Sequence, residues 1–423
     1  MLTLYRAVLY LALPLVLLRL GLRIRRSHAY RSRFLERFGF QTNAQNPDPG
    51  GIWIHAVSVG EVNAAIPLIN HILSAYPNHP LTVTTMTPTG SDRLISLFSN
   101  RVYHQYLPYD YPGAVNRFLK HVSPKLALIM ETEIWPNVIH ACHKKSIPII
   151  YTNVRLSRRS YQGYERFRKL IEPTLQKIND FAVQVDADAQ RLIQLGAREK
   201  SIHVTGNLKF DIPLAPSILE AAHSVRRNLG VDRPILVAAS THEGEETKVL
   251  EAFSLIRKTL DNTLLVLVPR HPERFTQVEK LCTKSGFTTS KRSLNKETIA
   301  PDTQVHLIDT MGELPLFLAA CDVSFIGGSL VEIGGHNLLE ANALGIPVIF
   351  GPHMFNFLEI ADLALQKGSA IQVQDENELA KVTIKLLQDP ILRDNCGSRG
   401  KELIEENRGS LEHVKTLISK AIA

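Results

Sequence analysis

Acidic side chains follow two short apolar runs in the first half of the chain. Glu61 ends the sequence Ser-Val-Gly-Glu, directly after the first run and at the predicted start of a helix. Glu131 and Glu133 follow a later run and precede a Trp-Pro pair. A carboxylate held on a rigid turn can act as a general base toward a hydroxyl group. The structural alternatives are a glutamate favoured by the helix dipole for Glu61, and solvated loop acids for the other two.

Basic side chains in the same half could bind an acidic ligand. Arg155, Arg158 and Arg159 follow the fifth apolar run, and Lys209 lies within Thr-Gly-Asn-Leu-Lys-Phe-Asp at 205–211. A ligand that carries both a carboxylate and a phosphate needs such cations. Each of these side chains, taken alone, is also typical of an ordinary surface charge.

The second half of the chain contains a pattern that favours nucleotide binding. Gly-Gly pairs at 327–328 and 334–335 leave backbone amides open to an anion, and a helix is predicted to begin near His336. Glu340, one turn into that helix, could hold ribose hydroxyls. Neither a P-loop nor a GxGxxG fingerprint is present, and loop flexibility is the alternative reading of the glycines. Further strand-end candidates lie at 240–245, which also reads as a capping box, at 269–272 and at 309–314.

These candidates lie at the ends of β-branched runs that alternate with segments of 3.6-residue periodicity. Such alternation predicts βαβ units, in which helices cover both faces of a parallel sheet. Ligands of these sheets bind beyond the carboxyl ends of the strands. The predicted strands are 52–57, 81–87, 103–108, 126–132, 148–154, 181–185, 234–240, 264–269, 305–309, 323–326, 347–350 and 370–373.

The alternation pauses near residues 207–233, where Pro213 and Pro216 accompany an amphipathic stretch. We therefore predict an α/β protein with two doubly wound Rossmann-like domains that face a cleft, preceded by an apolar anchor helix. The last helix can pack back on the first domain. The predicted divisions are an anchor with a basic segment at 1–39, an N-terminal domain at 40–210, a linker at 211–233 and a C-terminal domain at 234–423.

The positive charge of the chain belongs to its N-terminus. Residues 1–39 hold eight arginines and one glutamate, which account for the whole formal charge of +7. The rest of the chain is formally neutral, so a diffuse basic surface for nucleic acid is not supported. The 4 cysteines lie far apart without a CxxC pair, which favours neither a disulfide framework nor a zinc site.

An apolar segment at residues 2–22 is long enough to cross a bilayer core of roughly 30 Å. Its uncharged part spans only residues 7–18, so a helix that lies in the membrane interface is an alternative. No small-x-small cleavage site follows. Instead, Arg23, Arg25 and Arg26 come next, which predicts that the following domain stays in the cytoplasm and that these side chains could meet anionic lipid.

Together these residues resemble the bacterial Kdo (3-deoxy-D-manno-octulosonic acid) transferases, a family with the GT-B glycosyltransferase fold. The resemblance spans nearly the whole chain, anchor included. It rests on seven motifs in order, HAVSVGEV at 55–62, METEIWPN at 130–137, NVRLSRRS at 153–160, TGNLKFD at 205–211, PRHPERF at 269–275, DTMGEL at 309–314 and GGHNLLEA at 334–341.

The resemblance implies an inverting transfer of Kdo from CMP-Kdo to a lipid A precursor at the cytoplasmic face of the inner membrane. Glu61 would be the general base, and Glu131 and Lys209 would stabilise the transition state. The first domain would bind the acceptor and the second would bind CMP. The residues implied to hold CMP are Pro269, Arg270, Met311, Gly312, Glu313, Asn337, Leu338, Leu339 and Glu340. No cofactor is expected, and no metal is expected because no acidic DxD-type cluster occurs. A nucleic-acid partner is not expected either, because the chain beyond residue 39 is formally neutral.

Three other functions stay open at this point. The first is a GT-B transferase that uses a different nucleotide sugar with a lipid acceptor, which a donor competition assay would distinguish. The second is a sugar-nucleotide epimerase of the same fold, which has no need of an anchor. The third is a non-catalytic binding module, in which Glu61→Gln would leave function intact. The number of Kdo units transferred also stays open.

Overall fold

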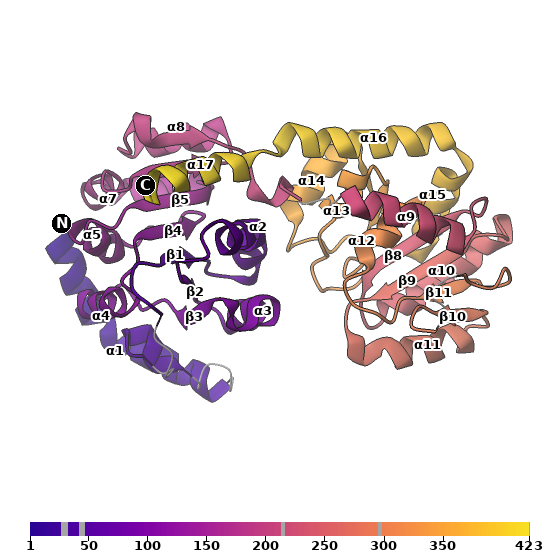
Figure 1. Ribbon diagram of the computed structural model, residues 1–423, viewed down its shortest axis with the longest axis horizontal. Helices are drawn as coiled ribbons and strands as arrows, with labels where there is room; N and C mark the ends of the chain where they lie inside the picture. Colours follow the sequence, from indigo (N-terminus) through magenta and orange to yellow (C-terminus); the bar gives the residue numbers. More distant parts are fainter. Residues whose placement is uncertain (27–32, 42–46, 213–215, 295–297, 423) are drawn as a thin grey trace. The chain divides into compact units, whose positions relative to one another are not determined.

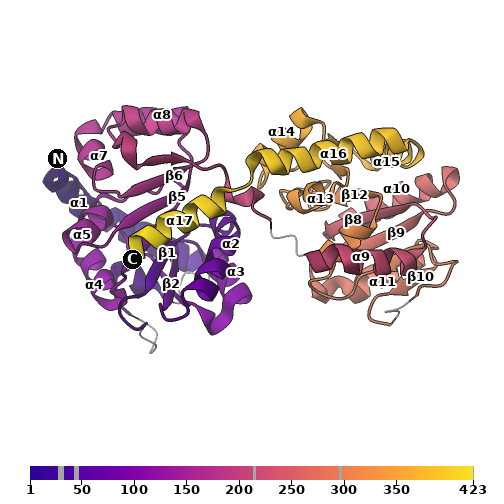
Figure 2. The same cartoon turned by 45° about the horizontal axis from the view of Figure 1, so that its top comes forward.

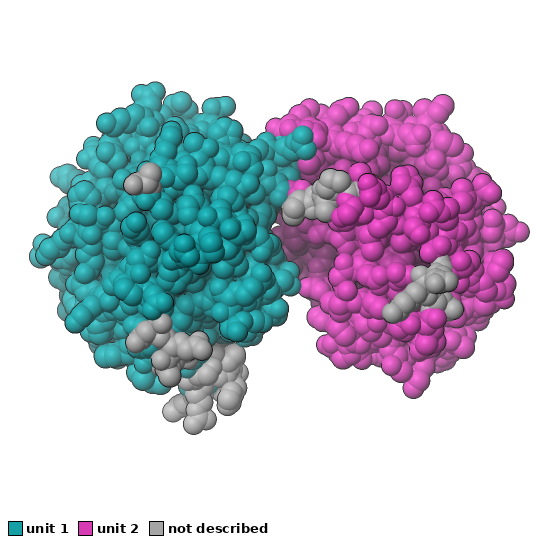
Figure 3. Space-filling model, viewed as in Figure 1, with its two compact units in different colours: residues 1–211, 407–423 teal, residues 212–406 magenta. Residues whose placement is uncertain are grey.

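Two seven-stranded parallel sheets, each covered by helices, form the protein (Figure 1). The computed structural model describes residues 1–26, 33–41, 47–212, 216–294 and 298–422. Its first unit comprises residues 1–211 with 407–423, and its second unit comprises residues 212–406 (Figure 3). The two doubly wound sheets and the apolar N-terminal helix confirm the predicted fold class.

The first sheet has the strand order β3-β2-β1-β4-β5-β6-β7. Its strands are β1 (Ile52–His55), β2 (Leu81–Thr85), β3 (Tyr103–Tyr106), β4 (Leu126–Met130), β5 (Ile149–Val154), β6 (Asp180–Val183) and β7 (Ile202–Val204). The helices of this unit are α1 (Leu2–Arg26), α2 (Val59–Ala75), α3 (Pro88–Phe98), α4 (Pro112–Val122), α5 (Pro136–Lys144), α6 (Arg158–Glu165), α7 (Arg168–Leu175), α8 (Asp186–Gln194) and α17 (Ser410–Ile422).

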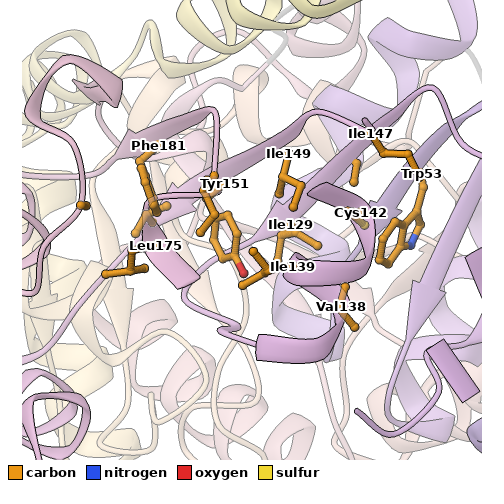
Figure 4. Close-up of a cluster of buried hydrophobic side chains, with 14 of the residues drawn as sticks. Trp53, Ile129, Val138, Ile139, Cys142, Ile147, Ile149, Tyr151, Leu175 and Phe181 are labelled. Atoms are coloured by element: carbon orange, nitrogen blue, oxygen red, sulfur yellow. The ribbon is translucent and has the colours of Figure 1, made fainter. Parts of the chain in front are cut away.

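Side chains of the central strand alternate between two hydrophobic clusters, as the pleat of a strand requires. Ile52 and Ile54 of β1 belong to one cluster. Trp53 belongs to the other cluster (Figure 4). There it packs against Phe118 of α4 with ring centroids 5.0 Å apart. Burial on both faces explains why these strands read as continuous apolar runs.

The second sheet has the strand order β10-β11-β9-β8-β12-β13-β14. Its strands are β8 (Ile235–Thr241), β9 (Leu264–Pro269), β10 (Thr289–Lys291), β11 (Val305–Leu307), β12 (Val323–Ile326), β13 (Val348–Phe350) and β14 (Ala370–Gln372). The helices of this unit are α9 (Pro216–Leu229), α10 (Glu245–Thr259), α11 (Phe275–Lys284), α12 (Leu314–Ala320), α13 (Leu339–Leu344), α14 (Leu358–Lys367), α15 (Glu376–Gln388) and α16 (Pro390–Asn407).

All twelve predicted strands form, within a few residues of their expected ends, but β7 and β10 were missed. Both are three-residue strands at an edge of their sheets. Their sequences, Ile-His-Val and Thr-Ser-Lys, carry no apolar run because an edge strand is only partly covered. Periodicity therefore detects the central strands and the edge strands β3 and β14, but not the two edge strands whose sequences lack an apolar run.

The segment predicted as a linker, 211–233, contains a helix. Most of it forms α9, which packs against α12 of the second unit and buries Ala222, Val225 and Leu229. The amphipathic stretch is thus a surface helix of that unit, since its apolar face finds a partner there. Pro213 lies outside the described residues.

The C-terminal helix α17 packs on β5 and β6 of the first sheet, as the sequence left open (Figure 2). Asp211 caps this helix from a distant part of the chain. Its carboxylate accepts hydrogen bonds from the backbone N–H groups of Gly409 and Leu411, each at 2.7 Å. An acceptor at this place satisfies amides that an α-helix leaves unpaired at its start.

The apolar N-terminal segment forms one long helix, α1, as predicted. Residues Leu2–Leu22 are long and apolar enough to cross a membrane, by length and composition alone. Residues 27–32 of the predicted basic segment, which include Arg31, lie outside the described residues.

Candidate active site

The predicted site residues lie where the strand order of each sheet reverses. In the first sheet the order reverses between β1 and β4, and in the second between β8 and β12. Helices leave opposite faces of a sheet at such a point, which opens a crevice at the carboxyl ends of the strands. Glu61 follows β1 and Glu131 follows β4. Both sheets therefore place polar side chains where ligands of this fold class bind.

Glu61 lies in the first turn of α2 and is nearly buried, with 6% of its surface exposed. Its carboxylate accepts hydrogen bonds from the Val57 backbone N–H at 2.8 Å and from the Ser58 hydroxyl at 3.2 Å. Burial is the main reason that the pKa of Glu61 is raised to about 8. The charges of Glu131 and Glu133 also raise this pKa, and the hydrogen bonds from Val57 and Ser58 lower it. The carboxyl group is thus tuned to exchange a proton near neutral pH.

The loop after β4 brings two more carboxylates to this edge. Glu131 has a left-handed backbone, with φ 55°, directly after the last residue of β4. Such backbones are costly for a residue with a Cβ and are concentrated at functional sites. Glu133 accepts a hydrogen bond from Trp135 Nε1 at 3.0 Å, and burial raises its pKa. The structure therefore joins Glu61 and Glu131 in one acidic group, together with Glu133.

The loops after β4 and β5 are tied together. The Thr132 hydroxyl donates to the carbonyl of Arg155. The side chains of Arg155, Arg158 and Arg159 are exposed, and Arg158 begins α6. These three arginines therefore lie at the surface beside the loop that carries Glu131, and none of them is buried.

Lys209 lies on a short 3-10 turn, Leu208–Phe210, that packs against α2, the helix that begins beside Glu61. Two side-chain oxygens hold this turn. Asn207 Oδ1 accepts from Lys209 N, and Asn153 Oδ1 accepts from Leu208 N, each at 3.0 Å. Asn153 is fully buried at the end of β5 with φ 58°, where the register with β6 shifts. Lys209 is thus placed at the same edge of the sheet as the carboxylates.

In the second unit, Glu245 organises the glycine-rich turn after β12. Its buried carboxylate accepts from the N–H groups of Gly328 at 2.7 Å, Ser329 at 3.0 Å and Leu330 at 2.9 Å. It also accepts from His242 N at 3.2 Å, which completes a capping interaction at the start of α10. The capping box predicted with Ser240 or Thr241 as the cap does not form, because the residue before α10 is Gly244, which makes no side-chain cap hydrogen bond. Glu245 instead fixes a loop 83 residues further along the chain.

Glycine is required in this turn for two reasons. A Cβ on Gly327 would collide with the backbone of Ser240, where the chain leaves β8. Gly335 has φ 73°, and a Cβ there would collide with the Met354 side chain. The Gly-Gly pairs thus allow close packing and left-handed turns, rather than loop flexibility.

Two histidines from different strand ends form a hydrogen-bonded pair. His242 Nε2 and His336 Nε2 are 2.7 Å apart, and the two rings are nearly coplanar at 7°. The ring centroids are 5.0 Å apart, so the rings meet edge to edge through their nitrogens and do not stack. His271 packs edge-on against His242 with centroids 5.2 Å apart.

The surroundings of this pair carry positive charge. Burial and, to a smaller extent, the charges of His271, Arg270 and Arg274 together lower the pKa of His242 to about 4. Arg270 follows Pro269, the last residue of β9, and its backbone N–H donates to Thr241 O at 3.0 Å. The carboxyl ends of β8, β9 and β12 therefore meet in a cationic group that an anion could occupy.

The turn between β11 and α12 contains three of the residues implied to bind CMP. Met311 is exposed, and Gly312 has φ 84°. Glu313 forms an ion pair with Arg292, with Nη2 and Oε1 2.8 Å apart, and accepts from the Thr310 hydroxyl. The carboxylate of Glu313 thus braces the turn, and Met311 remains open to a ligand.

The predicted helix near His336 begins later than expected. α13 runs only from Leu339 to Leu344, so Glu340 is its second residue and does not lie one turn in. Asn337 Oδ1 accepts from Leu339 N at 3.2 Å, a side-chain turn that delays the start of the helix. The side chains of Leu338 and Leu339 are fully buried, so only their backbone can meet a ligand. A six-residue helix has a small dipole, so the positive charge at this place comes from Arg270 instead.

Sequence reasoning assigned no individual role to three of these residues, although two of them lie in the candidate segment 240–245. Asn153, His242 and Glu245 act on backbone or side-chain groups that are distant in the chain, which spacing alone does not reveal. Their position directly after β5 and β8 was the available signal, since strand ends are where this fold class keeps functional groups. Among the described residues, no group of three or more His, Cys, Asp or Glu could hold a metal ion.

Two models of glycosyltransferase families match the two halves of the chain. A family model described as 3-deoxy-D-manno-octulosonic-acid transferase (kdotransferase) matches residues 32–212. A second model, described as glycosyl transferases group 1, matches residues 233–403. The boundary between the two matches lies close to the boundary between the two structural units.

Several individual proteins are similar over most of their length. A 3-deoxy-D-manno-octulosonic acid transferase of Haemophilus influenzae is 41% identical, over 98% of this chain and 97% of the relative. One from Bordetella pertussis is 36% identical, over 90% of each chain. Among solved structures, the C-terminal CMP-Kdo binding domain of an Acinetobacter baumannii protein is 32% identical, with a TM-score of 0.43, over 45% of this chain and all of that one.

Proposed function

Because the chain belongs to the Kdo transferase family and is a glycosyltransferase, we propose that it moves Kdo from CMP-Kdo to a lipid A precursor, with inversion at the anomeric carbon. The observation that carries the proposal is the buried carboxyl group of Glu61, which lies where the strand order of the first sheet reverses. Family membership also favours this function over the epimerase and the binding module.

In the proposed reaction, ionised Glu61 takes the proton from the acceptor hydroxyl as its oxygen attacks the anomeric carbon of Kdo. The bond from that carbon to the phosphate oxygen of CMP breaks, and CMP leaves with the electron pair. Inversion needs one base on the face opposite the leaving group, and the anomeric carbon passes through an oxocarbenium-like state. Glu131 would stabilise the positive charge of that state, and Lys209 would bind the Kdo carboxylate.

We assign the donor to the second unit. The phosphate of CMP would lie against the edge of the His242–His336 pair and Arg270, with the amides of the glycine-rich turn nearby. Pro269, the Met311–Glu313 turn and residues 337–340 would hold the remaining parts of CMP. The acceptor would be a lipid at the cytoplasmic face of the inner membrane, which gives α1 and its arginines a role.

The direct test is to incubate the detergent-solubilised full chain with CMP-Kdo and a tetra-acylated lipid A precursor, in the presence of EDTA. Mass spectrometry of the lipid should detect the addition of one or more Kdo units. Unlabelled UDP- and GDP-sugars should not compete with CMP-Kdo. A folded protein that binds CMP without adding Kdo to this lipid would contradict the proposed acceptor, and transfer from a UDP-sugar would contradict the proposed donor.

The histidine pair predicts that CMP binding takes up protons. In the free protein His242 is neutral at pH 6, because its pKa is lowered to about 4. A phosphate beside it favours the charged ring and raises that pKa, so a proton is bound on complex formation and CMP affinity rises as pH falls. Calorimetry at pH 6 in buffers of different ionisation enthalpy measures this uptake.

The control for this prediction is His242→Asn, which keeps a hydrogen-bonding side chain but cannot be charged. The phosphate of CMP contributes the same proton exchange in both experiments, so the difference in proton uptake between the two proteins reports His242 alone. We expect the variant to take up fewer protons and to bind CMP about tenfold more weakly at pH 6. Equal proton uptake by both proteins would remove His242 from the phosphate site.

A further inference from the structure

The apolar helix α1 is fastened to the first unit along one of its faces. The hydroxyl of Tyr5 donates to Asp110 Oδ2 at 2.9 Å, and Arg6 Nε donates to Asn137 Oδ1 at 2.7 Å. The hydroxyl of Tyr111 donates to the carbonyl of Leu9 at 3.1 Å. These contacts hold the first three turns of α1 beside α4 and α5 (Figure 1).

The attachment point is a built part of the unit and not a surface contact. Asp110 is 2% exposed, and its carboxylate also accepts from the N–H groups of Asn137 and Val138 at the start of α5, each at 2.9 Å. Tyr5 therefore adds a hydrogen bond to a carboxylate that is already fixed. Charge-assisted bonds of this kind are among the stronger contacts in proteins.

The packing of α1 extends far beyond these turns. Leu20 is only 4% exposed, fifteen positions after Tyr5. At 1.5 Å per residue, about 22 Å of helix therefore lies along the protein. In contrast, a helix that projects from a domain into a bilayer would leave all its turns except the last free of that domain.

The opposite face of α1 is an exposed apolar stripe. The exposed fraction of its side chains reaches 80% at Leu11 and 69% at Leu15. The spacing of three and four residues keeps these side chains on one face of the helix. The stripe consists of Leu4, Val8, Leu11, Leu15, Leu18 and Leu22. The sequence then places Arg23, Arg25 and Arg26 directly after it.

We propose that α1 lies in the plane of the membrane, with this stripe inserted into one leaflet that contains anionic phospholipid, and does not cross the bilayer. An apolar face of this kind sinks about 5–10 Å into the boundary between headgroups and acyl chains. The arginines after the stripe then meet the anionic headgroups. The first unit, which carries Glu61, is thereby held against the membrane surface.

A spanning arrangement conflicts with the docked face. If α1 crossed the hydrocarbon core, Tyr5 and Arg6 would have to leave Asp110 and Asn137, or the first unit would have to enter the core with them. Either change leaves polar groups without partners in a medium that cannot hydrogen-bond them. This inference rests on the proposed membrane location, so membrane topology and binding are measured separately from Kdo transfer.

The first experiment locates the N-terminus relative to the membrane. Thr3→Cys introduces an exposed thiol, and the four native cysteines are all buried, which keeps background labelling low. The full-length variant is expressed in cells and treated with a membrane-impermeant maleimide. We expect labelling in inside-out membrane vesicles, or only after detergent, and none from the periplasmic side of spheroplasts. Labelling of spheroplasts would overturn the proposal, because residue 3 would then have crossed the membrane.

The second experiment tests the stripe with purified full-length protein. Leu11→Asp combined with Leu15→Asp should weaken binding to phosphatidylethanolamine–phosphatidylglycerol vesicles by about tenfold or more. Ile391→Asp is the matched control, because Ile391 is 75% exposed but lies on α16 of the second unit. CMP binding should be unchanged in both variants. Vesicle binding that survives the double substitution would overturn the proposal. If the wild type bound equally well to vesicles without phosphatidylglycerol, the part of the proposal that requires anionic lipid would be overturned.

Discussion

Glu61→Gln should lower the rate of Kdo transfer by about 10²–10⁴-fold, the range expected when a general base is lost. The substitution keeps the shape of the side chain and can accept the Val57 N–H, so the fold of the loop should persist. CMP binding should not change, because Glu61 lies in the first unit and CMP is assigned to the second. Glu199→Gln, at an exposed position of the same unit, is the matched control.

The pH dependence of the reaction gives an independent test of the same role. A base works only when ionised, and burial raises the pKa of Glu61 to about 8. The value of kcat/KM should therefore rise with pH up to about 8 and then level off. Glu131→Gln removes a negative neighbour and so lowers the pKa of Glu61. The rise of kcat/KM should therefore shift to lower pH in this variant, whatever the maximal rate. If kcat/KM of the wild type did not rise with pH, or if the rise occurred at the same pH in Glu131→Gln, the general base would be another group.

The sequence could predict the centre of each sheet and the acidic part of the site for the same physical reason. Buried parallel strands must be apolar on both faces, so β1 and β4 are visible as runs, and Glu61 and Glu131 are the polar residues at which those runs end. The edge strands β7 and β10 lack such runs. The fold class was therefore predictable, and so were the edge strands β3 and β14, but β7 and β10 were not.

The supporting residues of the site were less accessible to sequence reasoning. Asn153 acts on the backbone of Leu208, and Glu245 acts on the backbone of Gly328 to Leu330. The groups that donate at these positions are backbone N–H groups, which carry no signal in the sequence. The late start of α13 was hidden for a related reason, since Asn337 competes for the first amide of the helix.

Glu245→Ala should have the largest effect on the second unit. It removes a buried carboxylate that accepts four backbone N–H groups and leaves those donors without their acceptor. Losing one partner of a buried, hydrogen-bonded charge costs about 3–5 kcal/mol of folding stability. The glycine-rich turn should lose its shape, so CMP affinity should fall by about 100-fold or more. Thermal unfolding and CMP titration measure the two effects.

Two further variants separate this role from a simple helix cap. Glu245→Gln keeps one acceptor oxygen but turns an amide NH₂ toward backbone donors. We expect it to lower the folding stability less than Glu245→Ala does, but by well over the roughly 1 kcal/mol that the loss of a helix cap costs. Glu251→Ala, at an exposed position of α10, should change neither stability nor CMP binding. If Glu245→Ala lowered stability by only about 1 kcal/mol and left CMP affinity intact, Glu245 would be a cap alone. The glycine-rich turn would then hold its shape through its own backbone hydrogen bonds, from Gly334 and Gly335 to Gly328 O at 3.1 and 2.8 Å.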